Sequence, residues 1–211
     1  MTEAEWLTCA NPRWMLNLVT ATASETSERK LRLFAVASFR RVLDMNSDGW
    51  GQTIDIAEQY ADARAEDREV RDFHIALISK NARAGSSFPI HPNARVAARG
   101  AVVLATDMRR SDDPDGVFGR IEEVPFQAAL LRDIFGNPFR PAALDPAWRT
   151  SDVMLLATGI YAEGAFDRMP ILADALQDAG CDSDDILTHL RDPHATHVRG
   201  CWALDLVLGK V

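Results

Sequence analysis

Four residues near the carboxyl-terminal end of the chain carry side chains that zinc prefers in proteins. They are Cys181, His189, His197 and Cys201, which lie eight, eight and four positions apart. Thiolate and imidazole groups are the usual ligands of Zn²⁺. Only the last two have the close spacing typical of structural zinc sites, and they would share a helix face unless Gly200 between them marks a helix edge. The pattern predicts these four residues as candidate metal ligands.

Two other interpretations of the same residues stay open. In the first, Cys181 and Cys201 are small buried hydrophobic residues, and His189 lies at the carboxyl end of a helix, where a positive charge is favourable. In the second, Cys201 is a nucleophile with His197 or His189 as base and Asp205 as the orienting group. That arrangement requires convergence in a cleft, which a sequence does not reveal. No catalytic residue is therefore assigned.

Other cofactor chemistries have weaker signals. The neighbouring acidic residues suggest calcium, but they lack the glycine and the terminal glutamate of a calcium loop, so helix capping explains them better. These residues are Asp178, Asp182, Asp184 and Asp185. No glycine cluster resembles a nucleotide-binding loop, and no cofactor is expected besides zinc in the metal-binding interpretation.

The bulk composition is that of a globular protein in a reducing compartment. Of 211 residues, 47% are hydrophobic, which is enough for a sizeable core. The 31 acidic and 23 basic residues give a net charge of −8, which disfavours nucleic-acid and anionic-membrane partners. The three cysteines do not suggest a disulfide framework, which favours a reducing compartment. The first residues are acidic, whereas a signal peptide begins with basic residues, and no apolar stretch is long enough to span a bilayer. We therefore expect a cytoplasmic protein.

Apolar residues recur at helical spacing along almost the whole chain, which predicts an all-α fold. The expected architecture is an irregular multi-helix bundle of about nine or ten helices. We expect a single domain over 1–211, with sub-halves 1–110 and 124–211 joined by a polar loop at 111–123.

The segment 28–45 is apolar on nearly all sides and is expected to be a central helix. Its basic residues include Arg40 and Arg41, which resemble a nucleic-acid stripe but are better explained by ion pairs with acidic neighbours.

Several element boundaries near the candidate ligands follow from capping signals. A helix from Val124 should end at Gly136, and the next long helix should be capped by Ser151 or Asp152. The last helix is expected from about Arg199 to Leu208, and Phe139 is expected in the core.

The chain resembles a paralogous family of uncharacterised bacterial proteins, familiar mainly from planctomycete genomes. The resemblance is carried by the segments beginning Met1-Thr2-Glu3-Ala4-Glu5-Trp6-Leu7 and Arg29-Lys30-Leu31-Arg32, and by the motifs Leu130-Leu131-Arg132-Asp133-Ile134-Phe135-Gly136-Asn137-Pro138-Phe139-Arg140-Pro141 and His197-Val198-Arg199-Gly200-Cys201-Trp202. Where such proteins tend to carry cysteines, this chain has Ser38 and Phe39. A metal site at that position would be impaired. The family supplies no reaction, substrate or cofactor.

These observations favour a non-catalytic helical module for protein interaction or regulation, whose partner is another protein. Trp50, Phe88 and Trp148 are the candidate anchors of its interaction surface. The alternative is a zinc-binding protein or metal-dependent hydrolase that uses the carboxyl-terminal Cys and His residues.

Overall fold

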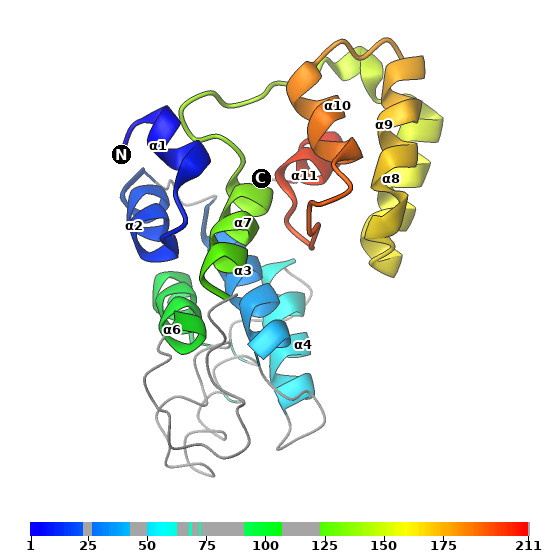
Figure 1. Cartoon of the computed structure of the whole chain (residues 1–211). Helices are drawn as coiled ribbons and strands as arrows, with labels where there is room; N and C mark the ends of the chain where they lie inside the picture. Colours follow the sequence, from blue (N-terminus) through cyan, green and yellow to red (C-terminus); the bar gives the residue numbers. More distant parts are fainter. Residues whose placement is uncertain are drawn as a thin grey trace. The chain divides into compact units, whose positions relative to one another are not determined.

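The computed structural model describes residues 1–22, 27–42, 50–62, 68, 72, 91–106 and 123–210 (Figure 1). Within these ranges the chain forms ten α-helices and two short 3₁₀-helices, and no β-strand, so the all-α prediction is confirmed. The elements are α1 (Glu3–Thr8), α2 (Pro12–Thr22), α3 (Ser27–Val42), α4 (Trp50–Ala61), α6 (Ala94–Thr106), α7 (Glu123–Phe135), η2 (Pro146–Trp148), α8 (Ser151–Glu163), η3 (Phe166–Arg168), α9 (Met169–Asp178), α10 (Asp184–Arg191) and α11 (Trp202–Leu208).

Packing contacts divide the chain into two compact units. The central unit is Thr8–Leu131, and the carboxyl-terminal unit combines Met1–Leu7 with Arg132–Val211. Of the polar loop expected at 111–123, only Glu123 lies within the described residues. The expected single domain with sub-halves 1–110 and 124–211 therefore stays a prediction.

Helix α3 is the centre of the central unit. Its side chains are buried on every side of the helix, and α4 and α6 pack against it. The fully or almost fully buried apolar residues of α3 are Leu31, Leu33, Phe34, Ala35, Val36 and Phe39. Gly100 of α6 is buried as well, which agrees with a close approach between α6 and its neighbour. The prediction of a central helix, made from its apolar pattern, is confirmed.

Three basic residues of α3 pair with acidic residues, as expected. Arg29 contacts Asp62 at 3.2 Å, and Arg41 contacts Glu123 at 2.8 Å. Arg40 reaches the carboxylates of both Asp55 and Glu58 on α4, at 2.9 and 3.0 Å. These three guanidinium groups have carboxylate partners, which favours the ion-pair explanation over a nucleic-acid stripe.

The two residues that stand where the resemblance predicts cysteine are part of the core. Ser38 and Phe39 are completely buried, and the Ser38 hydroxyl donates a hydrogen bond of 2.6 Å to the side-chain oxygen of Gln127. The position therefore serves packing and a buried polar pair.

The carboxyl-terminal unit is built from α8 to α11 around its own apolar core. Helix α9 packs against both α8 and α10, and α11 packs against α8 and α10 (Figure 1). The fully buried core residues include Val153, Ile160, Leu172, Leu176, Ile186, Leu190, Cys201 and Leu204. Residues of both α10 and α11 belong to this core.

Three expected details of this unit are wrong. The N-cap of α8 is Thr150, whose hydroxyl accepts a 3.4 Å hydrogen bond from the amide of Val153, so neither Ser151 nor Asp152 caps the helix. Phe139 is 42% exposed and lies in a turn in which the side chain of Asn137 accepts a hydrogen bond from the Phe139 amide. The last helix begins at Trp202 rather than at Arg199.

The sequence predicts no apolar stretch long enough to span a bilayer. Among the described residues, no helix combines the length and the apolar character needed to cross a bilayer.

Two glycines of the carboxyl-terminal unit make a matched test of the fold. Gly136 ends α7 with φ of 64°, and a Cβ there would lie 3.0 Å from the ring of Trp202. We expect Gly136→Ala to lower the free energy of unfolding by about 2 kcal/mol, from left-handed strain and crowding.

The control is Gly159→Ala inside α8, where a Cβ meets no atom within 4 Å. This substitution should raise the free energy of unfolding by up to about 1 kcal/mol, because alanine favours helix. Urea unfolding measures both variants, and equal stabilities would contradict the assignment of Gly136.

Candidate metal centre

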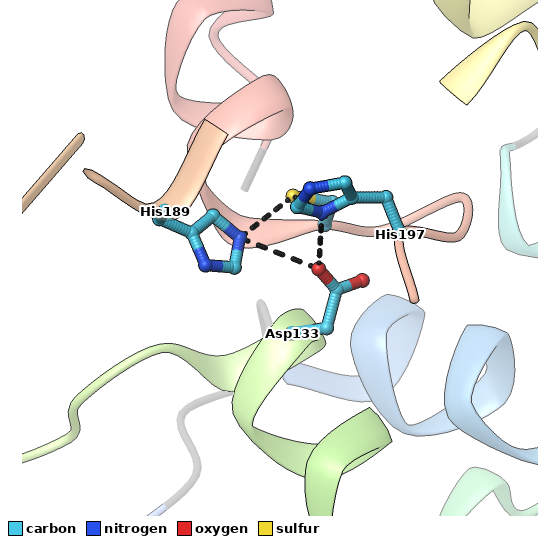
Figure 2. Close-up of side chains that lie close together, drawn as sticks. Asp133, His189 and His197 are labelled. Atoms are coloured by element: carbon cyan, nitrogen blue, oxygen red, sulfur yellow. Dashed lines mark hydrogen bonds and ion pairs between the residues drawn. The ribbon is translucent and has the colours of Figure 1, made fainter. Parts of the chain in front are cut away.

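Four side chains from three parts of the carboxyl-terminal unit converge on one point. Asp133 lies in the last turn of α7, His189 in the last turn of α10, His197 in the following loop, and Cys201 directly before α11. Figure 2 shows the two imidazole rings and the carboxylate pointing toward one another. One ligand atom from each of the four residues lies within 4.8 Å of the other three.

Four of the distances between these atoms are near those of a tetrahedral zinc site. The Asp133 Oδ1 atom is 2.8 Å from His197 Nδ1 and 3.3 Å from His189 Nε2. The Cys201 Sγ atom is 3.2 Å from His189 Nε2 and 3.7 Å from His197 Nδ1. A tetrahedron with zinc bonds of about 2.0–2.3 Å has edges of about 3.3–3.6 Å. The four distances, 2.8 to 3.7 Å, are close to these edges, whereas the largest separation within the group is up to 4.8 Å, so the side chains would have to draw together around a bound ion.

A turn in the loop before α11 places Cys201 next to His197. Gly200 has φ of 92°, and the amide of Cys201 donates a 3.0 Å hydrogen bond to the carbonyl of Val198. A positive φ at the third residue of a four-residue turn is typical of type II geometry, which glycine adopts without strain. The two residues four positions apart therefore meet across a turn, and not on the helix face that the spacing suggested.

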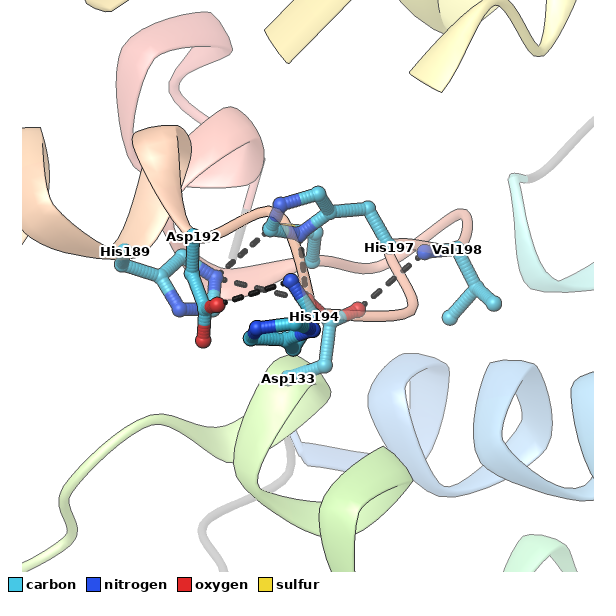
Figure 3. A network of polar contacts seen from close by, with 7 residues as sticks. Asp133, His189, Asp192, His194, His197 and Val198 are labelled. Carbon is cyan, nitrogen blue, oxygen red and sulfur yellow. Dashed lines mark hydrogen bonds and ion pairs between the residues drawn. The ribbon is translucent and has the colours of Figure 1, made fainter. Parts of the chain in front are cut away.

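The same loop orients the carboxylate of Asp133. The backbone amide of Val198 donates a 3.1 Å hydrogen bond to Asp133 Oδ2, which leaves Oδ1 directed at the two imidazoles (Figure 3). Earlier in the loop, the side chain of Asp192 accepts a 2.8 Å hydrogen bond from the amide of His194, which makes a local turn (Figure 3). In metal sites, a ligand side chain is commonly oriented by a hydrogen bond to the atom that does not bind the metal, as the Val198 amide does here for Asp133.

The imidazole rings are held by their neighbours. The rings of His189 and His197 meet edge to face with centroids 4.9 Å apart, and the ring of Trp202 lies 4.9 Å from that of His189. The side chains of Asp133 and His197 are 5% and 6% exposed, and that of His189 is 18% exposed. Little of the centre therefore faces water.

Burial and charge act differently on the two ionisable oxygen and sulfur ligands. Burial alone would raise the pKa of Asp133, but hydrogen bonds from His189 and His197 outweigh it and hold the pKa below its usual value. Burial raises the pKa of the Cys201 thiol well above its usual value, and the negative charge of Asp133 raises it further. Without a metal, the centre therefore contains a carboxylate and a neutral thiol.

Three of the four predicted ligands meet, and the fourth position belongs to a residue that the sequence analysis missed. Cys181 is buried in the apolar core and is not a member of the converging group. Asp133 takes part instead. One feature of the sequence could have identified Asp133: it is a carboxylate inside the apolar stripe of α7. It lies three residues after Leu130 and directly before Ile134, both of which are buried.

The geometry does not match a cysteine nucleophile with a histidine relay. Such a relay needs one ring nitrogen at the thiol and the other at the carboxylate. Here the same nitrogen of His189, Nε2, approaches both Cys201 and Asp133, and Cys201 is completely buried. Asp205, the expected orienting group, is not a member of the converging group.

The remaining sequence hypotheses concern residues outside this centre. Asp184 and Asp185 occupy the first turn of α10, where the helix dipole favours acidic residues, but the N-cap is Ser183 and it makes no side-chain capping hydrogen bond. Trp148 is half-buried against the core, whereas Phe88 and the side chain of Trp50 lie outside the described residues. The interaction surface therefore stays a prediction.

Comparison of the chain with protein-family models, curated proteins and solved structures gave no match. The resemblance to planctomycete-type bacterial proteins therefore stays a prediction, and the site is interpreted from its own geometry.

The buried carboxylate gives the protein a pH-dependent stability. We expect Asp133→Asn to lower the free energy of unfolding by about 2 kcal/mol at pH 7, because it removes charge-assisted hydrogen bonds. A lowered folded-state pKa stabilises the fold above the unfolded-state pKa of about 3.9, and this stabilisation is lost as the pH falls through the folded-state value. The difference between wild type and variant should therefore shrink on acidification.

Urea unfolding between pH 7 and pH 3, in the presence of a chelator, measures this difference. Asp174→Asn is the control, since Asp174 is exposed and its ion pair with Arg191 lies at the surface. A difference for Asp133→Asn that stays constant over this pH range would contradict the assignment.

Proposed function

We propose that the protein binds one Zn²⁺ ion through Asp133, His189, His197 and Cys201, and that the ion stabilises the fold of the carboxyl-terminal unit. One observation carries the proposal: four potential ligand atoms, of the types zinc prefers, lie within 4.8 Å of one another. They come from positions as distant as 133 and 201, so their convergence does not follow from sequence proximity.

The number of ligands supports a structural rather than a catalytic role. Catalytic zinc sites usually combine three protein ligands with an open position for water or substrate, whereas structural sites have four. Here four side chains supply four possible ligand atoms, the number of a closed site, and they are largely shielded from solvent. The proposal therefore favours a non-catalytic helical protein with a zinc centre over a metal-dependent hydrolase.

Charge balance also supports a divalent cation at this point. The Asp133 carboxylate is buried with its negative charge, and Cys201 beside it would add a second negative charge as a thiolate. A bound Zn²⁺ deprotonates a coordinating thiol and offsets both charges. The metal would thereby take the place of the thiol proton and neutralise the centre.

The proposed ion would connect the end of α7 to the loop between α10 and α11. Asp133 is separated by 56 positions from His189, the next ligand along the chain. A ligand that binds only the folded state stabilises it by RT ln(1 + [L]/Kd), which is about 2.7 kcal/mol when the free ligand concentration is a hundred times Kd. We infer that zinc binding is a means of stabilising this unit.

Zinc stoichiometry and ligand identity test the proposal. We expect untagged protein, freed of metal by a chelator, to bind one equivalent of Zn²⁺ and to give a Co²⁺ complex with tetrahedral and sulfur-to-metal absorption bands. Cys201→Ser should remove the sulfur band and weaken zinc binding about a hundredfold, because it removes the only thiolate ligand.

Cys181→Ala is the matched control, because this buried cysteine is not a member of the converging group. It should retain the sulfur band and the zinc affinity. Failure of the wild-type protein to bind stoichiometric zinc would sink the proposal, and loss of binding in Cys181→Ala would show that the ligand set is wrong.

A further inference from the structure

The first seven residues of the chain belong to the same compact unit as the candidate metal centre. Their helix, α1, begins with a reciprocal capping box: the amide of Glu5 donates to the Thr2 hydroxyl at 3.3 Å, and the amide of Thr2 donates to the Glu5 carboxylate at 2.7 Å. This capping fixes the start of a very short helix, which would not form alone in water. Trp6, on the next turn, is completely buried.

Three hydrogen bonds fasten this segment to the residues around Asp133. The indole N–H of Trp6 donates to the carbonyl of Gly136 at 3.0 Å, and the guanidinium of Arg132 donates to the carbonyl of Trp6 at 3.1 Å. The side-chain amide of Asn137 donates to the Glu3 carboxylate at 2.6 Å. The bonds hold the chain directly before Asp133 and again three and four residues after it.

The end of α7 is also held by a residue next to the metal centre. The ring of Trp202 lies so close to Gly136 that an added Cβ would be 3.0 Å from it, and the same ring lies 4.9 Å from His189. The carbonyl of Gly136 thus accepts a hydrogen bond from Trp6, and the ring of Trp202 occupies the space that a side chain at position 136 would need. The last turn of a helix is where fraying begins, because its carbonyls lack partners within the helix.

We propose that residues 1–7 act as a clasp that positions the Asp133 carboxylate for metal binding, with Trp6 as its positioning residue. This inference rests on the proposed zinc-binding function. When the clasp is open, the last turn of α7 loses the bonds at Arg132 and Gly136, and the carboxylate no longer has a fixed place. The apparent affinity for metal then falls with the fraction of molecules in the closed state.

The clasp and the metal therefore stabilise each other. Coupling between two binding events is reciprocal, so a clasp that strengthens zinc binding must itself be strengthened by zinc to the same degree. Closing the clasp raises metal affinity, and binding the metal reduces opening of the clasp.

Zinc affinity of two tryptophan variants tests the positioning role. Trp6→Phe keeps most of the buried ring and removes the indole N–H, and we expect its Kd for Zn²⁺, measured by competition with a chromophoric chelator, to rise about fivefold. The matched control is Trp14→Phe, because Trp14 is 66% exposed and lies in the central unit. It should leave the Kd unchanged.

A second variant tests the same role in case Trp6→Phe does not fold. Glu3→Ala removes only a half-buried carboxylate and its bond to Asn137, and it should raise the Kd two- to threefold with the helical circular dichroism unchanged. If Trp6→Phe does not fold, Glu3→Ala carries the affinity test on its own.

Hydrogen exchange tests the reciprocal effect. Zinc should slow amide exchange in the peptide covering residues 1–7 in wild type, and it should not do so in Cys201→Ser. If wild type binds zinc but the substitutions at Trp6 and Glu3 leave the Kd unchanged and residues 1–7 gain no protection, the clasp is overturned while the zinc centre stands. If wild type binds no zinc, the proposed function fails and the clasp has no metal to serve.

Discussion

The burial of the Asp133 carboxylate is the constraint on which the arrangement of the carboxyl-terminal unit depends. A charge removed from water is tolerated only with hydrogen bonds or opposite charges around it. The unit supplies these from the two imidazoles of His189 and His197 and from the backbone amide of Val198. The turn at Gly200 then adds a thiol to the same point. An apolar residue at position 133 would leave the two largely shielded imidazoles without this partner.

The packing around the end of α7 lies close in the chain to the same carboxylate. Gly136 is required there for two reasons, since its φ is 64° and the ring of Trp202 occupies the space of a side chain. The absence of a Cβ lets an indole ring lie against the backbone, one helical turn from the buried charge. Trp6 approaches the same residue through its carbonyl. Two tryptophans from opposite ends of the chain thus meet at one glycine beside the polar centre.

Periodicity predicted the helices well, because a helix that buries one face carries apolar residues three and four positions apart, and this spacing is visible in the local sequence. The all-round apolar pattern of α3 and the end of α7 at Gly136 are both present in the structure. Residue type and position identified His189, His197 and Cys201 as candidates, but not Asp133, because only tertiary packing brings a residue 56 positions away to them. Cys181 was included for its side chain alone, and its burial in the apolar core is likewise a tertiary property.

The discontinuous make-up of the carboxyl-terminal unit affects the order in which the chain folds during synthesis. Residues 1–7 leave the ribosome before any of their partners have been made, and the bond from Trp6 to Gly136 joins positions 130 residues apart. Contacts of such long range form late, because the entropy of closing the intervening chain must be overcome first. The indole of Trp6, buried in the folded protein, is therefore an exposed apolar group on the nascent chain until residues 132–137 have been made.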